Sequence, residues 1–193
     1  MKRYLIIILL SLSSAAPASG GDNCFPGKEH VLSSPSHKRE LVWNERKSQD
    51  ESHQLLYRAG GGRRPRELLK FDREICIHWS PGEKYFSISD YIGSNVAEVY
   101  IYKSDDVSHR VNVIDLLPEE TANYFRKGVL HGYIETLSWN SDGLIVRAFG
   151  DRENKPRKFD FTLKCTVDKD KWTCRKTAAN KSLQRTGQKA AFR

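Results

Sequence analysis

The sequence lacks a hydrophobic run long enough to span a bilayer. Its longest mostly apolar stretch, Tyr4 to Leu12, has nine residues, whereas a transmembrane helix needs roughly 20. The stretch follows Lys2 and Arg3 and precedes small residues at 13–21. This order of positive, apolar and small residues is typical of a secretory signal. We therefore expect residues 1–20 to be a signal peptide and the mature protein to be periplasmic or secreted, without a membrane anchor.

The sequence also lacks the short motifs that mark common catalytic and cofactor sites. It contains no Gly-x-Ser-x-Gly turn for a serine nucleophile and no glycine-rich loop that opens a helix for phosphate binding. No two cysteines have the Cys-x-x-Cys spacing of redox or zinc sites, and the six histidines are scattered. The sequence therefore predicts no catalytic residue, no cofactor and no metal ion.

Acidic residues are absent from the segment 175–193, in which Ala, Lys, Gln, Thr and Asn dominate. Such a segment buries too little apolar surface to offset its ordering entropy, so we expect a disordered basic tail. The tail carries six positive charges, and Lys2 and Arg3 carry two more of the net +8. The residues between them hold 24 basic and 24 acidic side chains. The pI of 9.3 therefore does not indicate a nucleic-acid partner.

Residues 21–174 are predicted to form a single β-rich domain, because their hydrophobic pattern mostly has a period of two. One helix is expected at about 118–127, where Pro118 and Glu119 favour its start and Gly128 its end. The predicted fold class is mostly β, an antiparallel meander or open sandwich of hairpins with one short α-helix. Strands are predicted at residues 39–43, 54–58, 67–71, 75–79, 85–89, 97–102, 110–114, 132–139, 144–150, 159–167 and 171–174.

Four cysteines in an exported domain of this size indicate two disulfides, with three possible connectivities. If residues 169–170 form a two-residue hairpin loop, Cys165 and Cys174 face each other at a non-hydrogen-bonded pair. At such a pair the Cα atoms lie about 4.5 Å apart, within the range of a disulfide. We therefore predict Cys165–Cys174, and Cys24–Cys76 follows by elimination.

A faint repeat joins two parts of the domain. Residues 79–82 read Trp-Ser-Pro-Gly and residues 139–143 read Trp-Asn-Ser-Asp-Gly, and each is followed by a strand. The pattern resembles the strand–turn–strand units of β-propeller blades. At about 40 residues per blade a closed propeller needs the whole domain, so the resemblance implies an open arrangement of such hairpins. The overall pattern resembles uncharacterised exported proteins of bacteria, which implies no activity. Residues 180–187 resemble the translated end of an integron gene cassette, which implies a mobile bacterial gene.

Tyrosines near the middle of the chain allow two interpretations. Tyr100 and Tyr102 share one face of a predicted strand, and Tyr85 and Tyr91 come from the preceding hairpin. These four residues form either the second buried face of a sandwich or an open binding patch. Tyrosine suits such a patch because it combines apolar area with a polar tip.

Two loops carry charges in a pattern that allows a ligand. Asp105, Asp106 and His109 offer three metal ligands, although such residues usually form a solvated turn. Gly60 to Gly62 precede Arg63 and Arg64 in a sequence that suits an anion, although a flexible hairpin loop explains it more simply.

Two functional hypotheses follow. The first is an exported binding or interaction module without catalytic activity, whose partner is a protein or a glycan. The second is a small extracytoplasmic hydrolase or carbohydrate-active domain, in which folding brings Asp90, Asp151 and His78 together. A pocket that holds at least two acids with perturbed pKa values would favour the enzyme.

Overall fold

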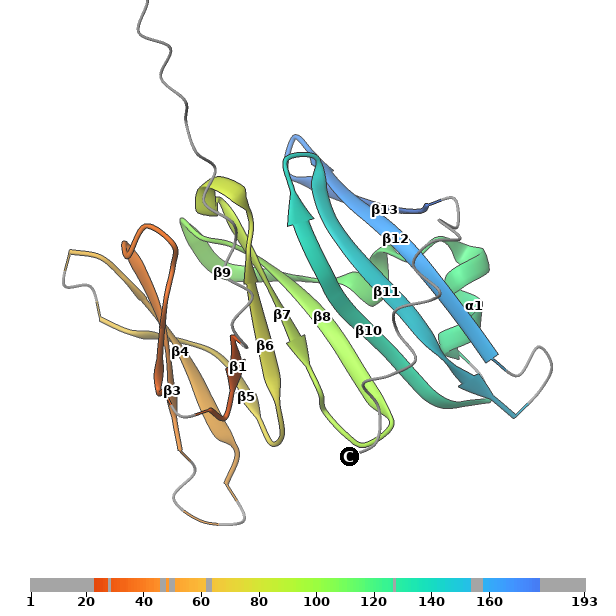
Figure 1. Ribbon diagram of the computed structural model, residues 1–193, viewed down its shortest axis with the longest axis horizontal. Helices are drawn as coiled ribbons and strands as arrows, with labels where there is room; N and C mark the ends of the chain where they lie inside the picture. The colour runs from red at the N-terminus through yellow and green to blue at the C-terminus, as the bar shows by residue number, and fades with distance from the viewer. Residues whose placement is uncertain are drawn as a thin grey trace, which may run out of the picture.

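The computed structural model describes residues 23–27, 29–45, 48, 51–61, 64–126, 128–153 and 158–177. The predicted signal peptide and residues 178–193 of the predicted tail lie outside these ranges. The chain is mostly β, with one α-helix (Figure 1). Its elements are β1 (Cys24–Phe25), β2 (Val31–Ser33), β3 (Arg39–Asn44), β4 (His53–Ala59), β5 (Arg66–Phe71), β6 (Ile75–Trp79), η1 (Pro81–Glu83), β7 (Tyr85–Asp90), β8 (Val96–Lys103), β9 (Asp106–Asn112), η2 (Val113–Leu116), α1 (Glu119–Arg126), β10 (Val129–Asn140), β11 (Gly143–Arg152), β12 (Lys158–Asp168) and β13 (Lys171–Lys176).

The described strands form two sheets. The smaller has the order β2-β3-β4-β5, and the larger has the order β1-β6-β7-β8-β10-β11-β12-β13, with β9 paired to β8. Neighbouring strands are antiparallel except β8 and β10, which pair in parallel over two positions. The segment with η2 and α1 makes the crossover between β9 and β10 (Figure 1). A single short parallel contact therefore joins two antiparallel units.

Strands β7 and β8 form a wall between two hydrophobic cores. All six residues of β7 are buried. Phe86 belongs to the core beneath the four-stranded sheet, where its ring stacks on those of Tyr57 and Tyr102. The preceding residue, Tyr85, belongs to the second core, with Trp172 of β13. Because side chains alternate across a strand, one continuous buried strand serves both cores.

The predicted mostly-β class with one short helix is confirmed, but several strands differ from the prediction. The strand predicted at 110–114 lies at 106–112, because the Asn112 side chain accepts a hydrogen bond from Ile114 N and begins a 3₁₀ turn. β1 and β2 were not predicted, because they are only two and three residues long. β13 continues through Lys176, so its last two residues belong to the sheet and not to the tail.

Both predicted disulfides are present. Cys165 and Cys174 are cross-strand partners with Cα atoms 4.0 Å apart, and both are buried. The hairpin loop lies at Lys169 and Asp170, as predicted, and both residues have positive φ angles. Such angles are characteristic of a tight hairpin turn, although Asn-Gly is the usual sequence there. The second disulfide, Cys24–Cys76, ties β1 to β6 and closes a separation of 52 residues.

Candidate functional site

The predicted tyrosine patch is not an open surface. Tyr85, Tyr100 and Tyr102 are at most 7% exposed and belong to the two cores. Tyr91 is half-buried, and its hydroxyl donates a hydrogen bond to Glu135 Oε1 at 3.0 Å. The core interpretation therefore describes three of the four residues, and no binding site can be built on them.

The three residues of the hydrolase hypothesis do not come together. His78 faces Ser87 across β6 and β7, whereas Asp90 faces Ile75. The two positions are three residues apart along the strands, or about 10 Å. Asp151 lies on β11, where its carboxylate contacts His131.

The pKa of the Asp90 carboxyl is nonetheless raised. Burial, and then the nearby negative charge of Glu98, raise its pKa to about 6. Burial lowers the pKa of the His78 imidazole. Each effect comes mainly from desolvation, which disfavours the charged form of either group. Neither His78 nor Asp90 lines either of the two ligand-sized pockets that the described residues form.

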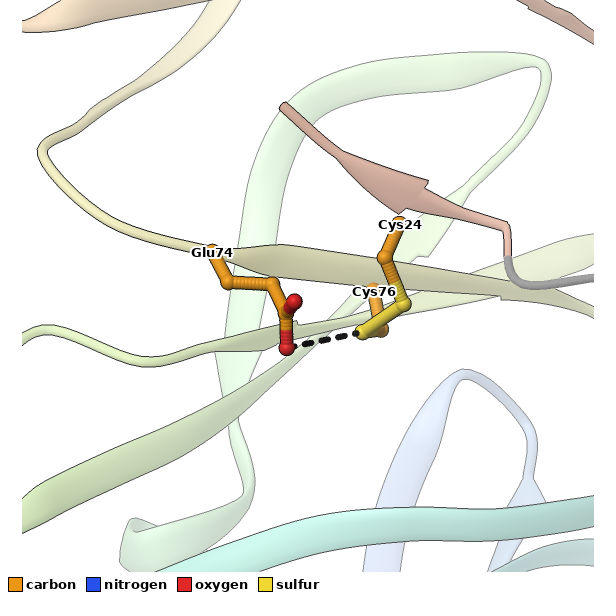
Figure 2. Close-up of side chains that lie close together, drawn as sticks. All are labelled: Cys24, Glu74 and Cys76. Carbon is orange, nitrogen blue, oxygen red and sulfur yellow. Dashed lines mark hydrogen bonds between the residues drawn. A yellow bond between two sulfur atoms is a disulfide. The ribbon is translucent and has the colours of Figure 1, made fainter. Parts of the chain in front are cut away.

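Two groups of side chains are candidates for metal ligands, the loop with Asp106 and His109 and the group around the Cys24–Cys76 disulfide. The Asp106 carboxylate accepts hydrogen bonds from the backbone and side chain of Ser108, and its contact with His109 Nδ1 is 3.8 Å. Within the described ranges, the one group with the spacing of metal ligands is Cys24, Glu74 and Cys76 (Figure 2). Both sulfurs belong to the disulfide, so neither is a thiolate that binds metal. Glu74 Oε1 lies 3.8 Å from the sulfur of Cys76.

A groove does lie on the outer face of β10, β11 and β12. Along β11, Leu144, Val146 and Ala148 point into the second core, so Arg147 and Phe149 point outward. The strand register places Tyr133 of β10 and Asp160 of β12 on either side of Phe149. Rings of α1 pack on Phe159 and Phe161, so the helix covers the inner face and leaves this one open.

The floor of the groove is a stack of flat groups. The Tyr133 and Phe149 rings stack with centroids 5.1 Å apart and an interplanar angle of 22°. The Arg147 guanidinium lies 4.3 Å from the Phe149 centroid. Its Nε and Nη2 donate to the two Asp160 carboxylate oxygens at 3.0 and 2.7 Å. This two-pronged pair raises the pKa of Arg147 and fixes the guanidinium plane over the ring.

The rim holds a histidine–carboxylate pair. His131 Nδ1 lies 2.7 Å from Asp151 Oδ1, and Lys158 lies opposite Asp151 on β12. Gly150 allows the close approach of β10 and β11, because a Cβ atom there would lie 1.9 Å from the carbonyl oxygen of His131. The close approach of the strands at Gly150 therefore brings the His131–Asp151 pair to the end of the aromatic floor.

The groove has the size and charge balance of a site for a small ligand. Its volume is about 460 Å³, within the roughly 300–1,000 Å³ of ligand pockets. Its lining contains two cations, Arg147 and Lys158, and two carboxylates, Asp151 and Asp160. The formal charges cancel, so the groove attracts neither anions nor cations strongly.

This site could not be predicted from the sequence. Alternation along 144–150 shows that Arg147 and Phe149 share a face, but it does not show which face is buried. The neighbours of Phe149 depend on the register of three strands, and β10 has a bulge between Thr136 and Ser138. A bulge changes the face of every residue beyond it, so Tyr133 could not be matched to Phe149 from the pattern alone.

Within the described residues, no helix is both long and apolar enough to cross a membrane. The two disulfides are compatible with an extracellular or periplasmic protein, because such bonds persist in oxidising compartments. Comparison with known proteins adds no family, since no protein-family model and no curated protein matches the sequence.

Proposed function

We propose that the protein is an exported binding module that holds an uncharged glycan in the groove on β10–β12. The feature that supports this proposal is the aromatic floor of Tyr133 and Phe149 beside the paired side chains of Arg147 and Asp160. A sugar ring has apolar C–H faces and hydroxyl groups around its edge. The aromatic floor suits the faces, and the unused donors and lone pairs of Arg147 and Asp160 suit the hydroxyls.

The charge balance favours an uncharged ligand. Arg147 and Asp160 already neutralise each other, and the formal charges of Lys158 and Asp151 also cancel. A charged ligand would have to compete with an existing pair or leave the groove with a net charge, whereas a neutral ligand does neither. The groups stand on neighbouring strands, and rigid elements hold a binding geometry better than loops do.

The position of the groove favours a glycan over an extended peptide. A peptide that binds by strand addition needs the free N–H and C=O groups of a sheet edge. β10 pairs with β8 and β11, and β12 pairs with β11 and β13, so the groove lies within the sheet. A ligand on this face is recognised by side chains alone, as hydroxyl-rich sugars can be.

The hydrolase alternative requires two acids with perturbed pKa values in one pocket. Burial raises the pKa of Glu135, and Asp90 also has a raised pKa. Neither lines the groove. We therefore propose binding without catalysis.

The proposal is tested with the mature, oxidised chain on an array of neutral oligosaccharides, followed by titration calorimetry with the best ligand. We expect Phe149→Ala to weaken binding about tenfold or more, as for an aromatic residue central to a site. Phe149→Leu keeps the apolar volume but loses the flat ring, so it should weaken binding as well. The matched control is Leu137→Ala, an exposed apolar residue on β10 outside the groove, which should leave affinity unchanged.

Two results would overturn the proposal. One is the absence of saturable binding to any neutral oligosaccharide by a folded protein. The other is a glycan affinity that both Phe149 variants leave intact while near-ultraviolet circular dichroism reports a native fold.

A further inference from the structure

A second pocket lies between the four-stranded sheet and the β8–β9 hairpin. Its volume is about 580 Å³, also within the usual range for ligands. β3, β4 and β5 contribute one wall, and the turn from Ser104 to Val107 contributes the other. None of its residues belongs to the groove on β10–β12, so an inference about this pocket is independent of the proposed glycan site.

The pocket has an excess of positive charge. Four cations line it, namely Lys38, Arg39, Arg64 and Arg66. Arg39 already has an ion-pair partner, because its Nη1 lies 3.4 Å from the buried Glu83 carboxylate. Within the described part of the chain, Lys38, Arg64 and Arg66 have no carboxylate within 4.0 Å. Three cations therefore line the pocket without a close ion-pair partner among the described residues, although the charge of Arg66 contributes to the lowered pKa of Asp106.

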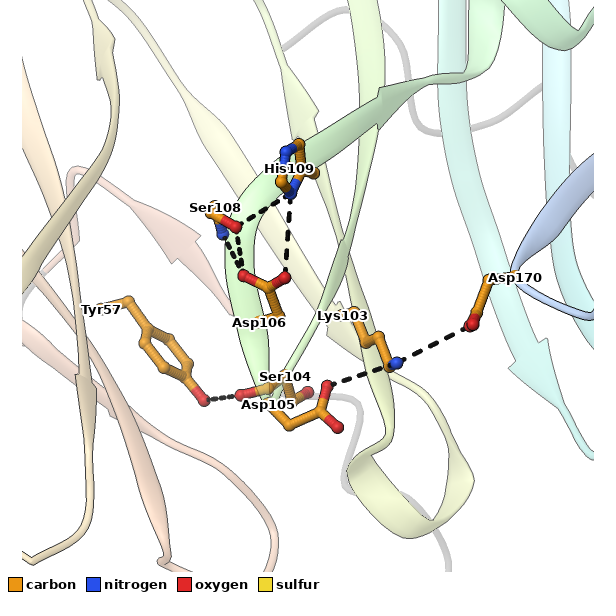
Figure 3. A network of polar contacts seen from close by, with 8 residues as sticks. All are labelled: Tyr57, Lys103, Ser104, Asp105, Asp106, Ser108, His109 and Asp170. Carbon is orange, nitrogen blue, oxygen red and sulfur yellow. Dashed lines mark hydrogen bonds and ion pairs between the residues drawn. The ribbon is translucent and has the colours of Figure 1, made fainter.

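The two acids of the lining are directed to other partners (Figure 3). Asp105 Oδ1 lies 3.9 Å from Lys103 Nζ, which in turn lies 3.7 Å from Asp170 Oδ1. Asp106 accepts hydrogen bonds from Ser108 within its own hairpin. Those hydrogen bonds lower the pKa of Asp106, so it remains ionised and bound to Ser108 at neutral pH. Neither acid forms a close ion pair with the three free cations.

The inner end of the pocket contains a buried hydroxyl without a partner. Ser104 is 3% exposed, and its Oγ makes no hydrogen bond within the described residues. The Tyr57 hydroxyl donates a hydrogen bond to the Ser104 carbonyl oxygen at 2.5 Å (Figure 3). The backbone carbonyl of Ser104 therefore has a partner, whereas its side-chain Oγ has none within the described residues. A buried hydroxyl without a partner costs free energy that a bound acceptor would recover.

We propose that this pocket binds a tetrahedral oxyanion, a phosphate or sulfate group carried by a larger ligand. Arginine side chains present planar forks of donors that match such oxygens, and a lysine adds a mobile charge. The Ser104 hydroxyl, which has almost no accessible surface in this structure, adds a further donor once its side chain turns toward the ligand. One phosphate does not fill the volume, so the remaining space fits the group to which the oxyanion is attached. Of the loop residues that suit an anion by sequence, Gly60 and Arg64 line this pocket.

The experiment is a nuclear magnetic resonance titration of the mature, oxidised protein at constant ionic strength. Inorganic phosphate, inorganic sulfate and acetate are the three probes. We expect saturable amide shifts at Ser104 and Arg66 with phosphate or sulfate and little response to acetate. Stronger binding of phosphate identifies a phosphate group as the ligand, and stronger binding of sulfate identifies a sulfate group.

The variants separate a site from general surface charge. Arg66→Gln should weaken binding about tenfold, because it removes a charge-assisted contact. Ser104→Ala should weaken it less and leave the fold intact. The matched control is Arg58→Gln, which removes the same charge from an exposed position on β4 outside the pocket. The proposal is wrong if no saturable shift occurs up to about 50 mM anion, if acetate binds as well as phosphate and sulfate, or if Arg58→Gln weakens binding as much as Arg66→Gln.

Discussion

The groove on β10–β12 and the pocket between the four-stranded sheet and the β8–β9 hairpin differ most in how their charges are paired. In the groove on β10–β12, Arg147 is matched by Asp160. In the pocket between the sheets, Arg64 and Arg66 have no such partner within the described residues, and the nearby acids contact other groups. The same residue types therefore make a neutral site in one place and a positive site in the other. The pocket lining also has four cations to two carboxylates, whereas the groove lining has two of each, so both pairing and composition make the pocket the more positive of the two.

The two regions are also held together differently. The strands from β10 to β13 are successive hairpins, and their disulfide closes a separation of only nine residues. The four-stranded sheet packs face to face on β6–β8 instead of continuing the larger sheet. The buried Glu83 contacts it directly through Ser36 and Arg39, and the Cys24–Cys76 disulfide, which lies within the larger sheet, closes the loop of chain that contains it. The pocket between the sheets depends on this docking, whereas the groove does not.

The largest expected effect comes from the longer disulfide. Replacing both Cys24 and Cys76 by Ala should lower the free energy of unfolding by about 4 kcal/mol, because a loop of 52 residues regains its entropy in the unfolded chain. The same change at Cys165 and Cys174 should cost about 3 kcal/mol. Urea denaturation of both variants measures the difference. A loss below about 1 kcal/mol for the first pair would contradict this loop-entropy explanation.

The next effect comes from Glu83. Its carboxylate is 6% exposed. Burial alone would raise its pKa, but the hydrogen bonds from the backbone and side chain of Ser36 and the charge of Arg39 lower it. Glu83→Gln should therefore destabilise the protein by about 2 kcal/mol, because Arg39 loses its partner. The matched control is Glu40→Gln, which breaks the exposed pair with Arg58 and should cost less than about 1 kcal/mol. Urea denaturation measures both variants. An equal loss of unfolding free energy in the two would show that the burial of Glu83 adds nothing to the strength of its pair with Arg39.

Asp90 should give an effect of similar size that depends on pH. Its pKa of about 6 in the folded protein exceeds the unfolded value of 3.8, so folding favours the protonated form. The stability from this group is present below pH 3.8 and is lost as pH rises towards 6 and above. Asp90→Asn should therefore stabilise the protein by about 2 kcal/mol at pH 7.5 and by almost nothing at pH 4. Paired urea titrations at the two pH values test this, and a gain that is the same at both would contradict it.

The smallest effect on stability is expected in the groove. Arg147 and Asp160 form an exposed pair, with side chains 40% and 54% accessible. Arg147→Gln should change the free energy of unfolding by less than about 1 kcal/mol while it weakens glycan binding about tenfold. Calorimetric titration and thermal unfolding of one preparation separate the two effects. A large loss of stability would mean that this pair supports the sheet rather than a ligand.

Much of the fold could be predicted because its signals are local. The 169–170 hairpin fixes the register of Cys165 and Cys174 within ten residues of chain, and α1 carries its acids and its glycine stop in sequence. The location of Tyr100 could not be predicted in this way. Alternation assigns it to a face of β8, but only the docking of a distant sheet shows that this face is covered.

The sites depend on long-range packing, which the pattern of one chain segment does not contain. Tyr57 and Ser104 are 47 residues apart in sequence, and their hydrogen bond closes the inner end of the pocket. The sequence around Arg64 suits an anion, but the opposite wall of its pocket, Ser104 to Val107, belongs to the other sheet. The sequence gives no sign of a site at Phe149, because its neighbours depend on a bulged strand.

The most direct test of two sites with opposite preferences is one nuclear magnetic resonance experiment with both ligands. The mature protein is titrated first with a neutral oligosaccharide that binds and then with inorganic phosphate. We predict that the oligosaccharide shifts amides of β10–β12 around Phe149, that phosphate shifts those around Ser104 and Arg66, and that neither ligand displaces the other. Competition between the two ligands, or oligosaccharide shifts centred on Ser104, would contradict the assignment of the groove to neutral ligands and the pocket to anions.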